Sequence, residues 1–126
     1  MDTTQQVLIN LSNHPKDTWQ FPQLERAKEL YGEVIDWAFP HIPPEADYTT
    51  VVEMAENIVS QIMATYGKYH LTIHIAGEIT FTYIFVNMMK EAGISCIAST
   101  TKRMVEVDEH GTKISKFAFV SFRGYF

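Results

Sequence analysis

Four short runs of β-prone apolar residues punctuate the chain. They are Val7–Leu11, Glu33–Phe39, His70–Ala76 and Ile94–Ser99. Runs of this length that end in turn residues are typical of strands. Two further segments, Met104–Asp108 and Lys113–Phe122, alternate around the sequence DEHG and predict a β-hairpin.

The segments between the first four runs have helical spacing, with apolar residues at every third or fourth position. They are Phe21–Tyr31, a segment that starts at Tyr48 or Thr49 and stops at Gly67, and Ile79–Ala92. In Ile79–Ala92 apolar residues occupy nearly every side, so we expect this helix to be buried all round. In a chain of 126 residues, such burial also suggests a subunit interface.

Strands that alternate with helices predict parallel pairing and right-handed crossovers. We therefore expect a single α/β domain over residues 1–126, a Rossmann-like three-layer sandwich with a mainly parallel sheet and a C-terminal β-hairpin. In such sheets ligands bind beyond the carboxyl ends of the strands. This rule brings three predicted loops to one rim: Ser12–Pro15, Gly77–Thr82 and Ser99–Arg103.

Composition narrows the class of partner. The 10 Lys and Arg residues stand against 15 Asp and Glu residues, giving a net charge of −5. This acidity argues against a duplex nucleic-acid binder but permits a small anionic ligand, which needs only a few local cations. The single cysteine, Cys96, lies in an apolar run and is expected to be a small core residue in a reducing compartment.

The sequence also predicts where the protein resides. Residues 1–6 are polar and lack the apolar stretch of a signal peptide. No apolar run approaches the roughly 20 residues that a membrane span needs. The longest, Ile79–Met89, is interrupted by Thr80, Thr82 and Asn87. We expect a cytoplasmic protein that does not engage a membrane.

The best anion-binding stretch follows the fourth apolar run. Three hydroxyl residues, Ser99, Thr100 and Thr101, precede two cations, Lys102 and Arg103. This stretch is either a ligand site or an exposed strand start. Because neighbouring strand residues point to opposite faces, we expect only one of the two cations to face a ligand. Arg103 is favoured, since a guanidinium can grip phosphate with two hydrogen bonds.

The loop around Gly77 offers a second set of candidates. Gly77 lacks a Cβ and permits close approach of a ligand, while the free N–H groups of the following helix favour an anion. Glu78 repels phosphate but can accept a hydrogen bond from a ribose hydroxyl. Thr80 either caps the helix or contacts the ligand.

The loop after the first strand offers a third set, Ser12, Asn13 and His14. His14 is a candidate general acid or base, because an ordinary histidine titrates near neutral pH, or else a solvated loop residue. His74 lies mid-strand and is expected to be a satisfied core residue. The five histidines and the carboxylates show no metal-ligand spacing, so we expect no metal and no cofactor.

Three of these stretches, INLSNHP, IAGEITFT and IASTTKR, resemble small stand-alone members of the CRISPR-associated Rossmann-fold (CARF) superfamily. The order of parallel strands followed by a hairpin is also similar, so the resemblance covers Val7 to Phe122. Some of these proteins are ring nucleases in type III CRISPR antiviral defence. The resemblance implies a cyclic oligoadenylate ligand, bound across the rim of a homodimer.

The resemblance also implies roles for individual residues. Ser12, Asn13 and His14, with the stretch Thr100–Arg103, would hold the ribose and the phosphate. Cleavage would need no metal, because a ribose 2′-hydroxyl is oriented to attack its own phosphate. Three hypotheses stay open: an enzyme that opens the ring, a protein that only sequesters it, and a purely structural dimerisation module.

Overall fold

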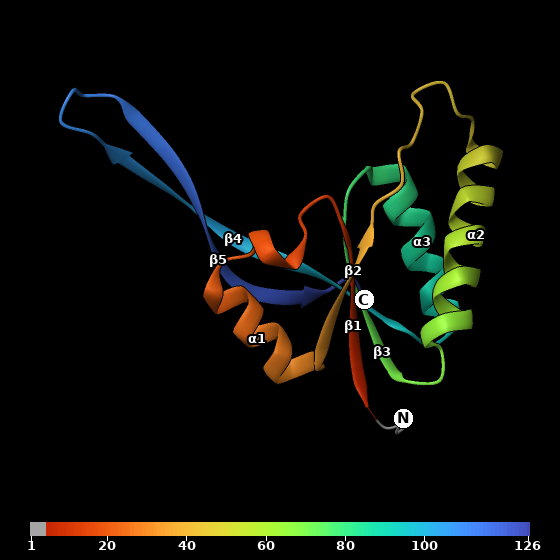
Figure 1. Cartoon of the computed structure of the whole chain (residues 1–126). Helices are drawn as coiled ribbons and strands as arrows, with labels where there is room; N and C mark the ends of the chain where they lie inside the picture. Colours follow the sequence, from red (N-terminus) through yellow and green to blue (C-terminus); the bar gives the residue numbers. More distant parts are fainter. Residues whose placement is uncertain (1–4) are drawn as a thin grey trace.

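The computed structural model describes residues 5–126, so most of the polar segment 1–6 that bears on a signal peptide lies outside the described residues. The elements, labelled in Figure 1, are β1 (Gln6–Ser12), the 3₁₀ turn η1 (Lys16–Thr18), α1 (Phe21–Tyr31), β2 (Glu33–Ala38), α2 (Tyr48–Tyr66), β3 (His70–Ala76), α3 (Ile79–Glu91), β4 (Ser95–Val107) and β5 (Lys113–Gly124).

The strands form one five-stranded sheet in the order β2-β1-β3-β4-β5. The pairs β1–β2, β1–β3 and β3–β4 are parallel, and β5 pairs antiparallel with β4. Each parallel connection passes through a helix, as a parallel pair requires. The predicted α/β class, with a mainly parallel sheet and a C-terminal hairpin, is confirmed.

Helices cover both faces of the sheet, with α1 on one face and α2 and α3 on the other (Figure 1). The central strand β1 is buried on both faces, and its side chains alternate between two cores. Ile9 and Leu11 belong to the core beneath α2 and α3, whereas Leu8 belongs to the core beneath α1. Cys96 joins the larger core, as expected, and burial raises the pKa of its thiol to about 12.

The prediction that α3 is buried all round is wrong. Phe81, Phe85 and Met89 are fully buried, but the opposite stripe of the helix faces solvent. On that stripe Ile79 is 79% exposed and Tyr83 is 71% exposed. The number of apolar residues in α3 overestimates its burial, because two large apolar side chains lie on the solvent-facing stripe of an otherwise amphipathic helix.

The predicted loop at 99–103 is also wrong, because these residues lie inside β4. The run Ile94–Ser99 and the first hairpin strand are one continuous strand, which pairs with β3 only over Ser95–Ile97 and then with β5 alone. The residues become polar where β4 leaves the core, but the ladder with β5 continues. Polarity therefore marks the loss of burial rather than the end of the strand.

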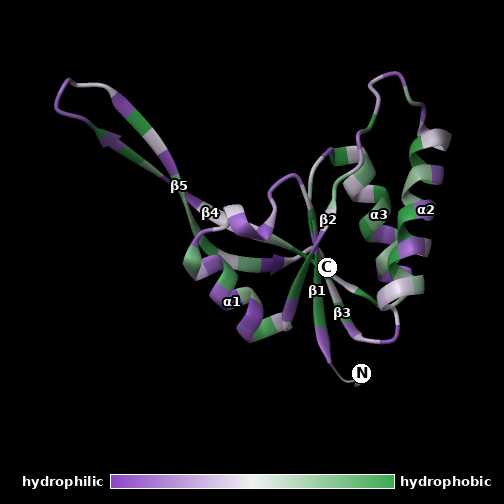
Figure 2. Cartoon of the chain, viewed as in Figure 1, coloured by the Kyte–Doolittle hydropathy of each residue, from purple (hydrophilic) through white to green (hydrophobic). Residues whose placement is uncertain are grey.

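The hairpin arm, defined here as residues 98–124, lies against α1 at its base and extends away from the helices towards its turn (Figure 1). Its turn forms as DEHG predicts: Asp108 accepts hydrogen bonds from the backbone N–H groups of His110 and Thr112, and Gly111 has a φ of 79°. Apolar and polar residues are mixed along the arm (Figure 2). Its exposed large apolar residues are Met104, Val105, Val107, Ile114, Phe117 and Val120.

Gln20, just before α1, ties the base of the arm to the body. Its side-chain amide donates to the Phe117 carbonyl (2.8 Å), and its carbonyl oxygen accepts from the Phe119 N–H (3.0 Å). These two backbone groups lie on the outer edge of β5, so the glutamine substitutes for one pairing step of a further strand.

Within residues 5–126, none of the helices combines the length and the apolar character needed to cross a membrane.

Replacing Gln20 with alanine should loosen the edge of β5 locally. The Phe119 N–H loses its acceptor, and a net hydrogen bond is worth about 1 kcal/mol, so its hydrogen exchange should accelerate about five-fold. Gln61→Ala is the matched control, because Gln61 lies on α2 and its amide bonds only the Asn57 side chain. Unchanged exchange of Phe119 in Gln20→Ala would contradict the proposed tie.

Candidate functional site

A pocket of about 240 Å³ opens at the carboxyl ends of β1 and β3, on the face of the sheet that carries α1. We call it the rim pocket. The residues that line it are Ser12, His14, Thr18, Trp19, Gln20, Gln23, His74, Ala76, Ser99, Thr101, Phe117 and Phe119. It therefore joins the end of the parallel sheet, the start of α1 and the base of the hairpin arm.

The rim pocket unites two of the three predicted regions. Ser12 and His14 come from the end of β1, and Ser99 and Thr101 come from β4. Arg103 lies two residues beyond Thr101 on the same face of β4, because alternate strand residues share a face. Its guanidinium donates to the Ser115 hydroxyl at 3.0 Å.

Thr100 and Lys102 belong to the opposite face of β4. The Thr100 hydroxyl bonds the backbone and side chain of Ser121 across the hairpin, so it has a structural partner outside the pocket. Lys102 is exposed. Only Arg103 of the two cations shares the pocket's face, which agrees with the alternation expected from the sequence.

The start of α3 differs from the predicted anion site. The Glu78 carboxylate accepts from the N–H groups of Thr80 and Phe81 and from the Thr80 hydroxyl. The expected free N–H groups are therefore already occupied. These bonds, led by the Phe81 N–H, lower the pKa of the Glu78 carboxyl, so it stays charged.

Gly77 and Asn13 also lie outside the rim pocket. A Cβ at Gly77 would come within 2.6 Å of three carbon atoms of the Phe39 ring, so close packing of that ring accounts for the glycine. Asn13 lines two neighbouring hollows beside Phe39. The rim therefore divides at Ala76: β1, β3 and β4 meet in one pocket, and the loop into α3 lies outside it.

The sequence predicts that His74 is a core residue with satisfied hydrogen bonds. The burial is confirmed, but the satisfied hydrogen bonds are not. The side chain is buried, with the whole residue only 3% exposed, but its Nε2 atom has no hydrogen-bond partner. Among the described residues it is the one buried side-chain nitrogen or oxygen in this condition. Because a buried polar atom without a partner is costly, Nε2 needs a hydrogen-bond donor from a water molecule or a ligand.

A row of polar residues crosses the sheet and orients His74. Asp36, Asn10 and His74 occupy adjacent register positions on β2, β1 and β3. The Asn10 amide nitrogen donates to the Asp36 carboxylate (3.0 Å) and to the His14 carbonyl (2.9 Å). The Asn10 oxygen lies 3.0 Å from His74 Nδ1 and also accepts from the Ser12 hydroxyl.

This row fixes the tautomer of His74. Asp36 and the His14 carbonyl are both acceptors, so the Asn10 amide must present its nitrogen to them and its oxygen to His74. His74 Nδ1 then carries the proton, and Nε2 carries a lone pair. Burial lowers the pKa of His74 to about 4, which keeps the ring neutral at physiological pH.

Aromatic rings hold the imidazole in place. Trp19 contacts it edge-on with 5.1 Å between ring centroids, and Phe122 contacts it edge-on at 5.8 Å. The indole N–H of Trp19 donates to the His14 carbonyl at 2.9 Å. Trp19 thereby joins the loop after β1 to the wall of the rim pocket. Neither Trp19 nor Asn10 was identified from the sequence.

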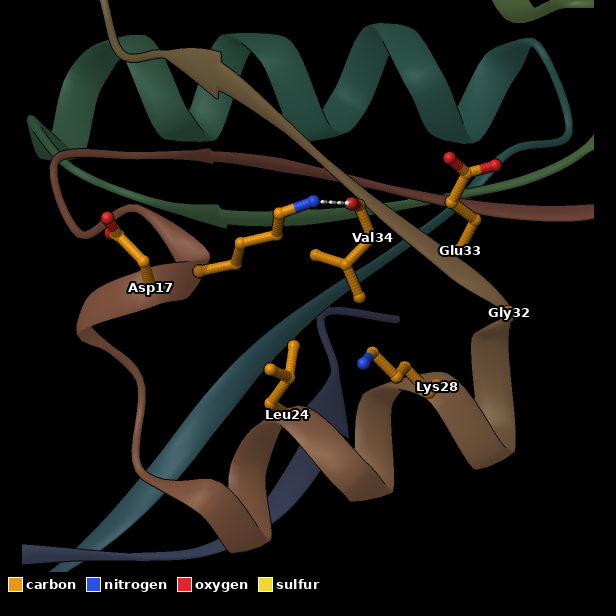
Figure 3. Close-up of a pocket in the computed structure, with 7 residues that line it drawn as sticks. Asp17, Leu24, Lys28, Gly32, Glu33 and Val34 are labelled. Carbon is orange, nitrogen blue, oxygen red and sulfur yellow. Dashed lines mark hydrogen bonds between the residues drawn. The ribbon is translucent and has the colours of Figure 1, made fainter.

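A larger pocket of about 490 Å³ lies beneath α1 at the amino end of β2 (Figure 3). Leu24 and Val34 form its floor, and Lys28 lies at its side. The Lys16 ammonium there donates to the Val34 carbonyl at 2.9 Å, so it already has a partner. The rim pocket is the better candidate because it lies at the ligand-binding end of the sheet and contains an unpartnered buried atom.

The fold and the rim pocket define a small Rossmann-like α/β protein with one candidate ligand site at the carboxyl edge of its sheet. Residues 6–123 match the sequence model of the Uncharacterized protein MJ1673 family, so the chain belongs to this family. No curated protein matches the chain. Within residues 5–126, no group of three or more His, Cys, Asp or Glu side chains is placed to hold a metal ion.

Burial of neutral His74 predicts a specific loss of stability in mild acid. Its pKa is about 4 in the folded chain and 6.5 in the unfolded chain, so the unfolded state binds more protons between these values. The free energy of unfolding should be highest above pH 6.5 and fall by about 3 kcal/mol as the pH drops to 4. Urea unfolding across this range measures it.

The matched control is His74→Phe, which keeps an aromatic ring against Trp19 and Phe122 and cannot titrate. Its stability should be nearly flat between pH 6.5 and 4.5, because the lowered pKa values of Asp47 and Glu78 act at lower pH. Equal pH dependence in the two proteins would show that other groups titrate in this window.

Proposed function

We propose that this protein binds a cyclic oligoadenylate at the rim pocket, within a homodimer, and opens the ring without a metal ion. The observation that supports the proposal best is the composition of the pocket at the ligand-binding edge of the sheet. It combines hydroxyl donors, aromatic walls and the unpartnered nitrogen of His74. A nucleotide presents matching groups: phosphate, base and sugar.

Each group of a nucleotide has a counterpart in or beside the pocket. The exposed ring of Phe117 and the half-buried Phe119 offer surfaces on which adenine can stack. The hydroxyls of Ser99 and Thr101 can donate to phosphate oxygens. Arg103, next along the same face of β4, supplies the positive charge.

The proposed reaction is an internal transesterification. A ribose 2′-oxygen forms a bond to the adjacent phosphorus while the bond from phosphorus to the 5′-oxygen breaks. His14 takes the proton of the 2′-hydroxyl and returns it to the leaving 5′-oxygen. The products are a 2′,3′-cyclic phosphate and a free 5′-hydroxyl, so all atoms come from the ligand.

Binding without cleavage is the second candidate. Among the described residues that line the rim pocket there is no lysine or arginine, and Arg103 reaches the Ser115 hydroxyl rather than the pocket. A weakly charged pocket is better suited to hold a ring than to stabilise the charge that develops on a reacting phosphate. Product analysis separates the two candidates.

The homodimer is proposed on three grounds. A pocket of about 240 Å³ holds one nucleotide, so a ring of several nucleotides needs more than one protomer. The hairpin arm exposes apolar residues on an extended two-stranded ribbon, which is marginally stable alone. The arm also carries a net charge of +2 and the remainder of the chain −7, so the arm of one copy complements the body of another.

The decisive experiment incubates the protein with labelled cyclic tetra- and hexa-adenylate, with and without EDTA. Binding together with linear products that form equally in EDTA supports the proposed enzyme. Binding with no products supports the sequestering protein. Absence of binding to both rings at micromolar protein rejects the proposed function. Turnover that disappears in EDTA and returns with Mg²⁺ rejects the metal-independent step.

The two cations of β4 should differ in their effect on binding. Arg103→Ala removes a charge-assisted hydrogen bond to phosphate, worth about 1.5–3 kcal/mol, so affinity should fall about ten- to a hundred-fold. Lys102→Ala is the matched control on the opposite face of the strand and should bind almost as the parent does. Calorimetric titration measures binding, and thermal melting confirms that both variants fold.

Light scattering at micromolar concentration should give about twice the protomer mass of 14.5 kDa. High salt should weaken the dimer, because the arm and the body have opposite charge. Replacing Val105 and Val107 with glutamate should produce monomers. The control places two glutamates at Thr49 and Asn57, exposed positions on α2, and should leave the dimer intact. A parent protein of monomer mass would refute the homodimer.

A further inference from the structure

The geometry of His74 carries an inference about which part of the ligand enters the rim pocket. We propose that His74 Nε2 is a hydrogen-bond acceptor that recognises a sugar hydroxyl of the ligand, and that it makes the site selective for ribose over deoxyribose. The inference rests on the proposed function for the identity of the ligand. It concerns the bound ring before any cleavage, because the single hydrogen of a 2′-hydroxyl can go to His74 or to His14 but not to both at once.

The first step is the direction of the hydrogen bonds. The Asp36 carboxylate and the His14 carbonyl can only accept, so they fix the orientation of the Asn10 amide. The Asn10 oxygen can only accept, so His74 Nδ1 must donate to it. His74 Nε2 is therefore left with a lone pair and no proton.

The second step is the position of that lone pair. His74 is 3% exposed and lines the rim pocket, and its covered Nε2 atom has no partner among the described residues. The ring is held by its Nδ1 bond and by its contacts with Trp19 and Phe122. The partner is therefore a water molecule or a ligand group that enters beside the ring, and it must bring a hydrogen.

The third step is the chemistry of the ligand. A phosphate diester has only acceptor oxygens, so a neutral nitrogen lone pair repels it. A ribose in a 3′–5′ linked ring has one free hydroxyl, the 2′-hydroxyl, and deoxyribose has none. A site built around a buried acceptor rejects an analogue that lacks the donor, because the acceptor is then left unpaired. The ligand's other donor is the adenine amino group, but the base is placed on Phe117 and Phe119, so the nucleotide sits with its sugar against His74 and its phosphate towards β4.

The test compares cyclic tetra-adenylate with its fully 2′-deoxy counterpart by calorimetric titration. The parent protein should bind the ribose ring about ten-fold or more tightly. Equal affinity for the two rings overturns the inference about His74 and leaves the proposed function standing. Failure to bind either ring rejects the proposed function, and the assignment of ribose falls with it.

Two variants form a matched pair for the same titration. His74→Asn keeps a donor near the position of Nδ1 and removes Nε2, so it should lose the preference for ribose. His74→Gln places an amide oxygen near the position of Nε2 and should retain part of the preference. A preference that survives undiminished in His74→Asn assigns ribose recognition to another residue and overturns the inference.

A measurement without any ligand tests the first step alone. Nitrogen-15 NMR of the imidazole at pH 7 should show a protonated Nδ1 and an unprotonated Nε2, the less common neutral tautomer. A protonated Nε2 would overturn the inference whichever ring binds, because the atom would then be a donor. Adding cyclic tetra-adenylate should shift the Nε2 resonance more than that of Nδ1.

Discussion

The row of Asp36, Asn10 and His74 is the constraint on which the candidate site depends. Each residue lies on a different strand, and the strands are parallel to one another. Asn10 and His74 are buried polar residues that need partners, and they pair with each other and with the exposed Asp36 across β2, β1 and β3. A slip of one residue would turn them into the opposite core, and the row therefore helps to hold the register.

The row also leaves one buried acceptor without a partner among the described residues. Asp36 satisfies one end of the Asn10 amide, and the chain of donors then leaves an unpaired acceptor at the other end, on His74. The unpaired atom lies at the carboxyl edge, where β1 and β3 end and open the sheet to solvent. The hydrogen bonds that join the three strands thus also leave an acceptor unpaired in the candidate site.

The hairpin arm closes the pocket from the side, and residues outside the sheet hold its base through Gln20 and through the rings of Trp19 and Tyr31 against Phe122. Gln20 pairs with the outer edge of β5, and this places Phe117 and Phe119 beside the loop after β1. The long β4 leaves the core without a break, and its residues become polar as it does so. A surface that the sequence places in a loop is therefore a strand face.

The sequence by itself determined the α/β class, the order of the elements, and the meeting of Ser12, His14, Ser99 and Thr101 at the rim of the sheet, where the candidate pocket lies. These follow from local periodicity and from the handedness of parallel connections, which depend on residues near one another in the chain. Only the tertiary structure decided that Glu78 caps its own helix, that β4 continues through Arg103, and that His74 lacks a partner. The state of His74 depends on which distant groups meet, because Asn10 and His74 are 64 residues apart and become neighbours only through strand register. The Glu78 cap, by contrast, is a local contact with residues two and three positions further on.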